Sequence, residues 1–440
     1  MMNSRSKALS LLKSANPKFD LTNQRHQEQL LDLSDDILIL DDLSVEDLQQ
    51  LSHQYDAPLA FQLAIKLVES RRYLLSITQQ LKLAVVFAMW GEHNRLEPKD
   101  ANNPNGEDSL RTKVTQLEWA TKDTKVEWSL YAVDDGCPHN SAQIAREIAN
   151  GMDYELENAL LPYSQCSLVE RLHILELSDA LPTKSGPLAN LANANDSRKG
   201  GAIILGCQSA LDNGADAVVY TDADNSVHLG QLGLILQPYV EQGKSVVLGN
   251  RKHKNSILVK QEERWGAGIK TLRHMQRMIG SPIFEHGIKD TQAAFKLYDR
   301  NVLKEILKKP TVYDFSFDTD WILAAMEINQ PIDTIPFAFI DSVAESASIV
   351  QGPMTTWYVL LDGLVKAAQA RKADYSKEMA DVFNKEIKSH EDLELIIDVV
   401  PPELVRASDS DLGDPKIMSP QSVRNWILSA KMLQAQIDTA

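Results

Sequence analysis

The sequence has little of several features that mark large classes of proteins. Its three cysteines in 440 residues, Cys137, Cys166 and Cys207, are too few and too widely spaced for a disulfide framework or a structural zinc site. It lacks the run of about 18 apolar residues that a membrane span needs. Its N-terminus lacks the apolar core and cleavage site of a signal peptide. We therefore expect a cytoplasmic protein with no integral membrane span.

Positive charge is also scarce. Lysine and arginine total 45 against 61 aspartates and glutamates, which gives a formal charge of −16. Such a chain repels nucleic-acid phosphates and anionic membrane surfaces at long range, so no nucleic-acid partner is expected. Hydrophobic residues make up 43% and charged residues 24%, which is typical of a folded globular protein.

Two common nucleotide-binding motifs are missing. No GxGxxG follows a predicted strand, which argues against a nicotinamide oxidoreductase. Gly243-Lys244-Ser245 does not complete a P-loop, because Pro238 stands where that motif has its first glycine.

The pattern of apolar residues changes along the chain. From about His26 to Leu81 apolar residues recur at helical intervals, and the chain after Ala370 is again helical and polar. Between these parts, helical stretches alternate with short apolar runs that end in polar residues: LKLAVVFAMW, VEWSLYAV, RLHILEL, ADAVVYT and SVVLGN. This alternation predicts an α/β protein with a mostly parallel sheet, helices on both faces, and ligands beyond the carboxyl ends of the strands.

We expect three parts: a helical N-terminal extension over 1–81, the α/β domain over 82–350, and a helical C-terminal extension over 351–440. The extensions carry no cluster of catalytic residue types, so they are candidates for a structural collar or for a surface that forms a homo-oligomer.

Two strand ends carry paired carboxylates. In YTDADN, Asp222 and Asp224 are two residues apart, so in extended chain they point the same way and both can face one hard divalent cation. Asp134 and Asp135 end another strand. Turns use the same residues, so either pair can also be a simple turn.

Between these strand ends lies SRKGGA, residues 197–202. Its two glycines let backbone amides approach an anion at a helix start, and its cations neutralise phosphate. Lys199 and Gly200 are therefore candidate phosphate-binding residues, with an ordinary first helical turn as the alternative.

Three segments, VYTDADNS, GIKDTQAAFKLYDR and FSFDTDWIL, occur in this order downstream. With them the chain resembles the family 2 glycosyltransferases of the GT-A fold, most closely the branch of the dolichyl-phosphate glucosyltransferases. VDDGCPHNS and residues 198–202 fall where that family keeps its nucleotide-contacting VDDGS and its GKG-type turn. The resemblance covers about 83–348.

The resemblance implies a Rossmann-like, three-layer GT-A core and a metal-dependent, inverting transfer of a hexose from a nucleotide-diphosphate sugar to an acceptor. It implies that Asp222 and Asp224 hold Mn²⁺ or Mg²⁺ with the diphosphate, and that Asp318 is the acceptor base, with Asp320 as the second candidate. Asp318 can also be a helix cap. The implied substrate-binding residues are Asp134 and Asp135 at the nucleoside, Lys199 and Gly200 in the GKG-type turn, and Asp290, Gln292 and Lys296 in the donor and acceptor wall. Arg251, at the end of a predicted strand, is a further substrate-binding candidate.

The sequence departs from the family in three places. The first strand ends in WGEHN rather than an asparagine-glutamate turn, so Glu92 is only a candidate counterpart. The loop over 97–113 is unusually long, and the hydrophobic membrane anchors of the dolichyl branch are missing. We therefore expect a soluble acceptor.

Two other functions share parts of this pattern. A sugar-phosphate nucleotidyltransferase has the same layers and metal aspartates, but it should carry a glycine-rich, arginine-containing loop after its first strand, which FAMWGEHNRLEPK does not supply. A catalytically inactive scaffold would have no need to keep Asp222, Asp224 and Asp318 together.

Overall fold

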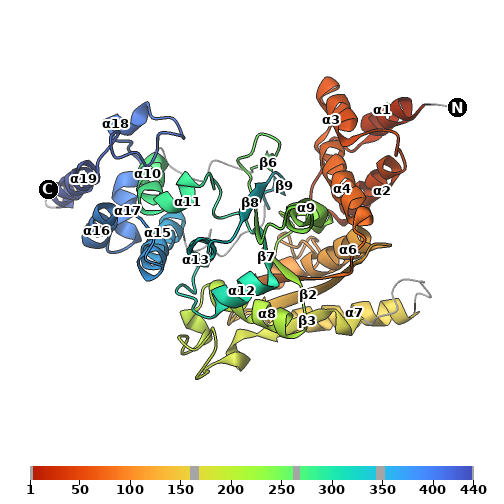
Figure 1. Cartoon of the computed structure of the whole chain (residues 1–440), viewed down its shortest axis with the longest axis horizontal. Coiled ribbons are helices and arrows are strands. Elements are labelled where there is room, and N and C mark those ends of the chain that lie inside the picture. The colour runs from red at the N-terminus through yellow and green to blue at the C-terminus, as the bar shows by residue number, and fades with distance from the viewer. Residues whose placement is uncertain (1–2, 159–167, 261–267, 343–351, 439–440) are drawn as a thin grey trace.

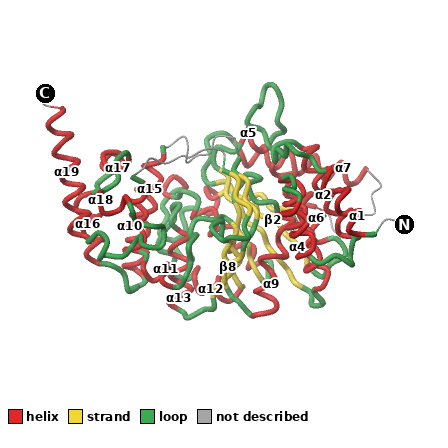
Figure 2. The backbone as a smooth tube through the Cα atoms, turned by 90° about the horizontal axis from the view of Figure 1, so that it is seen from above, coloured by secondary structure: helices red, strands yellow, loops and turns green. Residues whose placement is uncertain are grey.

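The computed structural model describes residues 3–158, 168–260, 268–342 and 352–438. A mixed sheet lies between two groups of helices, and the two termini lie at opposite ends of the long axis (Figure 1). Figure 2, seen from above, shows the strands in the middle of the molecule with helices on either side.

The main sheet has seven strands in the order β3-β2-β1-β4-β7-β5-β8. All neighbours pair in parallel except β7, which runs antiparallel to both β4 and β5. A two-stranded parallel sheet, β6 and β9, lies beside it. The strands are β1 Leu81–Met89, β2 Val126–Asp134, β3 Leu172–Glu176, β4 Ala217–Thr221, β5 Val246–Gly249, β6 Ile257–Val259, β7 Phe295–Asp299, β8 Ile332–Ile335 and β9 Ala338–Ile340.

Helices cover both faces of the sheet, because alternate residues of each strand point to opposite sides. In β1, Ala84 and Val86 belong to one buried cluster, while Val85 and Phe87 belong to another. The first cluster includes side chains of α8 (Gly200–Asp212), α12 (Arg300–Leu307) and α13 (Phe317–Glu327). The second includes side chains of α6 (Ser109–Thr121), α7 (Ser141–Asn158) and α9 (Leu232–Gln242). The core is therefore three-layered, as predicted.

The N-terminal part folds into four helices: α1 Ser4–Ser14, α2 Gln24–Leu38, α3 Val45–Gln54 and α4 Leu59–Ser76. Ser44 and Asp47 form a reciprocal capping box at the start of α3. The buried side chains of these helices share one cluster with Ala338 and Ile340 of β9. The N-terminal helices therefore pack directly on the α/β core.

The C-terminal helices form a second group, blue in Figure 1. They are α15 Pro353–Ala370, α16 Lys377–Glu386, α17 His390–Ile397, α18 Pro402–Val405 and α19 Pro420–Asp438. Helix α10 (Ile269–Ile279) packs against α15, α16 and α17, although it precedes β7 in the chain; the short helix α11 (Ser281–Glu285) follows it. The division of the chain at residues 81 and 350 stays a prediction.

The fold class predicted from the sequence is confirmed, and the five apolar runs expected to be strands are β1 to β5. Strand β7, the sequence FKLYD, was expected only as part of a motif. Its antiparallel insertion between β4 and β5 depends on long-range pairing that a local pattern does not show. In the described part of the chain, no helix is both long and apolar enough to cross a membrane.

The packing of α4 on α9 can be tested at Gly233. Its amide donates to Ser70 Oγ (2.7 Å), and a Cβ on Gly233 would lie 2.1 Å from the Ser70 carbonyl oxygen. We expect Gly233→Ala to lower the free energy of unfolding by about 1–3 kcal/mol, since the backbone of α4 must shift. Urea denaturation measures this.

Gly151→Ala is the matched control, because this helical glycine of α7 has nothing closer to its would-be Cβ than Arg111 Nη2 at 4.0 Å. It should leave stability unchanged or raise it by up to about 1 kcal/mol through better helix propensity. Equal stability of the two variants would contradict the close contact of α4 with α9.

Candidate active site

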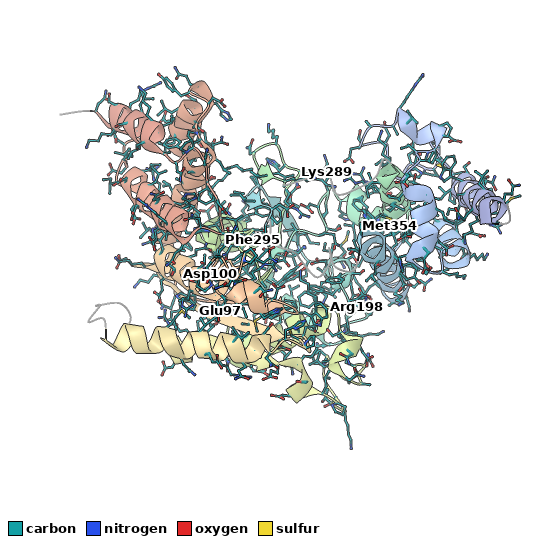
Figure 3. All side chains as sticks on the ribbon, turned by 180° about the vertical axis from the view of Figure 1, so that it is seen from behind. Glu97, Asp100, Arg198, Lys289, Phe295 and Met354 are labelled. Carbon is teal, nitrogen blue, oxygen red and sulfur yellow. The ribbon has the colours of Figure 1, made fainter. Side chains whose placement is uncertain are left out.

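The predicted site residues gather at one edge of the sheet. Strands β1, β2, β4 and β5 run in the same direction, so the segments after their carboxyl ends meet there. The Asp135 amide donates to the Met89 carbonyl oxygen (2.9 Å), which ties the end of β2 to the end of β1. Figure 3 shows Arg198, in the segment that opens α8, near the middle of the molecule.

Asp134 and Asp135 hold the turns around this edge. Asp134 Oδ1 accepts from the Cys137 amide (2.8 Å), and burial raises the pKa of Asp134. Asp135 accepts from Ser197 Oγ (2.6 Å) and from the Lys199 amide (2.5 Å). Burial raises the pKa of Asp135 to about 6, against the opposing effect of these hydrogen bonds. Asp135 thus fastens the segment before α8 to the end of β2.

Lys199 bridges two of the predicted motifs. Its backbone is bound to Asp135, and its Nζ forms an ion pair with Asp222 Oδ1. Its φ of +79° is strained for a side-chain-bearing residue, so the surrounding contacts hold this conformation. The next residue, Gly200, packs so closely that a Cβ would lie 2.6 Å from the backbone carbon of Tyr313. Only glycine fits there.

Asp222 and Asp224, the two aspartates after β4, have different surroundings. Burial would raise the pKa of Asp222, but the contact with Lys199 lowers it below the usual value. Asp224 accepts from the Ser226 amide (3.0 Å), and burial together with neighbouring Asp222 raises its pKa to about 6. A divalent cation beside the Asp224 carboxylate would therefore stabilise its ionised form.

The described residues contain no group of three or more His, Cys, Asp or Glu side chains arranged to hold a metal ion. That is compatible with Mg²⁺ or Mn²⁺, because such ions are often held by one or two carboxylates plus the phosphates of a substrate. Asp222 and Asp224 fit a cation that arrives with a diphosphate better than a permanently bound one.

Arg251 and Asp290 form a bidentate ion pair across the site. Arg251 Nε and Nη2 lie 2.8 Å from the two oxygens of Asp290, and the Arg251 amide also donates to Asp290 Oδ2 (2.9 Å). Burial opposes ionisation, but these contacts lower the pKa of Asp290 to about 2. Gln292, two residues on, is partly exposed, and its amide contacts Thr291 Oγ1 (3.4 Å). Of the three predicted site residues in this segment, Asp290, Gln292 and Lys296, Gln292 is the one whose side chain is partly open to solvent.

Asp318 and Lys296 form a second ion pair, deep in the core. Lys296 Nζ donates to Asp318 Oδ1 (2.9 Å), to Tyr220 Oη (2.8 Å) and to the Ala293 carbonyl oxygen (2.6 Å). Burial raises the pKa of Asp318 and lowers that of Lys296. The Lys296 side chain has 0% exposure and that of Asp318 has 5%. The ammonium of Lys296 therefore supports the Asp318 carboxylate, and direct contact of Lys296 with a substrate stays a prediction.

Asp320 lies on the same helix but faces the protein interior. Its two oxygens accept from Arg371 Nε (2.9 Å) and Nη2 (3.2 Å), and also from the amide and hydroxyl of Thr311. With 0% exposure, Asp320 joins α13 to the end of α15 in this structure, and its role as the second-candidate base stays a prediction.

Two glutamates pair with Arg95, and the sequence pattern pointed to one of them, Glu92. Glu92 is the candidate counterpart of the family's glutamate, and burial raises its pKa to about 7. The other, Glu107, was not predicted. Glu107, at the end of the long loop, is 2% exposed and pairs with the same Arg95 (3.0 Å) while accepting from the Asn225 amide (2.9 Å). The length of the loop hid Glu107, since local sequence does not show where a long connection returns.

No family model matches the chain. A search of curated proteins found a dolichyl-phosphate β-glucosyltransferase, ALG5D, of Trichomonas vaginalis, 23% identical over 217 residues. The match covers 49% of this chain and 55% of that protein, so the chain spans about half the length of this relative. The resemblance to family 2 glycosyltransferases drawn from the motifs is thereby confirmed.

Over about half of its length, the chain is similar in sequence to a glycosyltransferase of family 2.

Among solved structures, similarity is found to glucosyl-3-phosphoglycerate synthase of Mycobacterium tuberculosis. Its complex with phosphoglyceric acid gives a TM-score of 0.44 at 12% identity, over 70% of this chain and 85% of that one. Its complex with Mg²⁺ and uridine diphosphate gives a TM-score of 0.43 at 12% identity, with the same coverage.

The Arg251–Asp290 pair predicts a specific dependence of stability on pH. Because the folded-state pKa of Asp290 is about 2, below the ordinary value of 3.8, the pair stabilises the fold above about pH 4 and loses this effect as the pH falls toward 2. Asp290→Asn should lower the free energy of unfolding by about 2 kcal/mol at pH 7 and by progressively less below pH 4.

Urea denaturation of both proteins from pH 7 to pH 2.5 checks this. Asp36→Asn, at an exposed position of α2, controls for the loss of one negative charge. A difference between wild type and Asp290→Asn that stays constant over the whole pH range would contradict the assignment.

Proposed function

We propose that this protein is a hexosyltransferase of the family 2 type, which moves a sugar from a nucleotide-diphosphate sugar to an acceptor with inversion. The observation that carries the proposal is the bridge made by Lys199. Its amide binds Asp135 and its ammonium binds Asp222, so the three predicted donor motifs form one site.

The donor fits this arrangement part by part. Asp134 and Asp135, at the end of β2, are the proposed nucleoside contacts. Lys199 supplies positive charge and Gly200 close backbone approach at the start of α8, where helix amides favour an anion. Asp224, together with Asp222, would hold Mn²⁺ or Mg²⁺. When bound there, the ion neutralises negative charge on the leaving diphosphate.

Asp318 is the proposed base for a hydroxyl acceptor. Its Oδ1 is engaged by Lys296, which leaves Oδ2 to take the proton. In the reaction the acceptor oxygen bonds to the anomeric carbon and the bond from that carbon to the diphosphate oxygen breaks. The bonding pair leaves with the diphosphate, and the acceptor proton passes to Asp318. A pKa raised by burial makes this carboxylate a stronger base than an exposed aspartate.

The acceptor is the least constrained part of the proposal. The name of the Trichomonas relative specifies a dolichyl phosphate acceptor. A phosphate acceptor is already ionised and needs no base, whereas a hydroxyl acceptor does. The role of Asp318 therefore separates these two acceptor classes.

The metal assignment predicts the effect of Asp224→Asn. This variant should lose Mn²⁺-dependent binding of a nucleoside diphosphate by more than about tenfold, because an amide is a weaker ligand than a carboxylate. Isothermal titration with uridine and guanosine diphosphates, with and without Mn²⁺, measures it, and circular dichroism checks the fold. Undiminished metal-dependent binding would remove Asp224 from the metal site.

The base assignment predicts that Asp318→Asn depresses transfer to a hydroxyl acceptor by about 10²- to 10⁴-fold while donor binding stays nearly intact. Transfer from a panel of nucleotide sugars, measured as release of nucleoside diphosphate, is the assay. In a separate assay, release of pyrophosphate from a nucleoside triphosphate and a sugar 1-phosphate would point to the nucleotidyltransferase alternative.

Asp299→Asn is the control for Asp318→Asn. Asp299 caps α12 through the Asn301 and Val302 amides, and asparagine caps a helix about as well. It should leave transfer unchanged. Full activity of Asp318→Asn with a hydroxyl acceptor would exclude Asp318 as the base.

A further inference from the structure

The loop from Glu97 to Asp108 is tightly folded against the site. The Glu107 amide donates to the carbonyl oxygens of Arg95 (3.2 Å) and Glu97 (3.1 Å), which closes the loop at its base. At Gly106 a Cβ would lie 2.4 Å from the Pro98 carbonyl carbon, so the outgoing and returning segments of the loop are in direct contact. This packing fixes Glu107 in a buried position.

Glu107 accepts two hydrogen bonds from Asn225, the residue that follows Asp224. Its Oε2 accepts from the Asn225 amide (2.9 Å), and its own carbonyl oxygen accepts from Asn225 Nδ2 (3.0 Å). Lys113, one turn into α6, donates to the Asp224 carbonyl oxygen. Hydrogen bonds from α6 and from the loop that precedes it thus restrain the backbone at Asp224 and Asn225.

The other oxygen of Glu107 is also used. Oε1 accepts from Arg95 Nε (3.0 Å) and from Ser342 Oγ, just after β9. Both oxygens therefore receive donors, which a carboxylate can do and a glutamine amide cannot, because its NH₂ group would face an N–H donor in either orientation.

We propose that Glu107 is a positioning residue, which sets the backbone of Asp224 and Asn225 so that the Asp224 carboxylate can receive the cation and diphosphate of the donor. The effect on donor binding rests on the proposed function. The restraint that Glu107 places on Asn225 can be measured without any ligand. Glu107 itself contacts neither donor nor acceptor in this assignment.

The first experiment is amide hydrogen exchange on the full-length protein without ligands. In Glu107→Gln, amides of the segment 222–226 should exchange about tenfold faster, while amides of α9 keep their wild-type rates. Glu97→Gln is the matched control, since the Glu97 side chain lies exposed on the same loop, where Figure 3 labels it.

The second experiment separates positioning from general stability. Glu107→Gln should bind Mn²⁺ with uridine diphosphate about 10- to 100-fold more weakly, while nucleotide binding measured without metal is unchanged. A loss of folding would move both quantities together. Ser342→Ala, which removes one donor to Glu107, should give a smaller loss in the same direction, and it decides the matter if Glu107→Gln does not fold.

The outcomes distinguish the two proposals. If wild type binds the metal and nucleotide and Glu107→Gln binds them equally well, the positioning role is overturned while the proposed function stands. If the amides of residues 222–226 exchange at the same rate in Glu107→Gln as in wild type, the hydrogen bonds from Asn225 to Glu107 do not restrain this segment, and that part of the inference is refuted. If wild type binds no nucleoside diphosphate with any metal, the proposed function fails, and the consequence inferred for Glu107 fails with it.

Discussion

A carboxylate taken out of water remains ionised only when a cation or several hydrogen-bond donors replace the lost solvation, and this constraint shapes the whole site. Five acidic side chains in and around the site lie in ion pairs. The pairs are Glu107 with Arg95, Asp222 with Lys199, Asp290 with Arg251, Asp318 with Lys296, and Asp320 with Arg371. Each cation comes from a different segment of the chain, so the pairs also fasten those segments together.

Asp224 is set apart from these pairs. It is partly exposed, its carboxylate accepts from the Ser226 amide, and burial together with the neighbouring Asp222 and Glu107 raises its pKa. The surroundings thus restrain its position while disfavouring its negative charge. A carboxylate in that condition gains most from an arriving cation, which is the physical basis for placing the metal of the proposed reaction there.

The helical ends support the site from both sides. The N-terminal helices share a buried cluster with β9. Ser342, two residues after β9, donates a hydrogen bond to Glu107. On the other side, Arg371 caps the C-terminus of α15 and pairs with Asp320 in α13. The helix that carries Asp318 is therefore anchored by the C-terminal group. The extensions, which contain no catalytic motif, are part of what orders the site.

The sequence by itself determined the alternation of strands and helices, because buried strands need continuous apolar runs and helices need their own period. It also determined which strand ends carry carboxylates, and the order of motifs that relates the chain to the family 2 glycosyltransferases. Tertiary structure decided which charges meet. Lys296 and Asp320 resemble substrate and catalytic residues in sequence, yet both are fully buried in ion pairs. Glu107 carries no local signal, and only the return of a long loop brings it to Asn225. Pairing over such separations depends on how the loops and layers pack, and local residue patterns do not encode that.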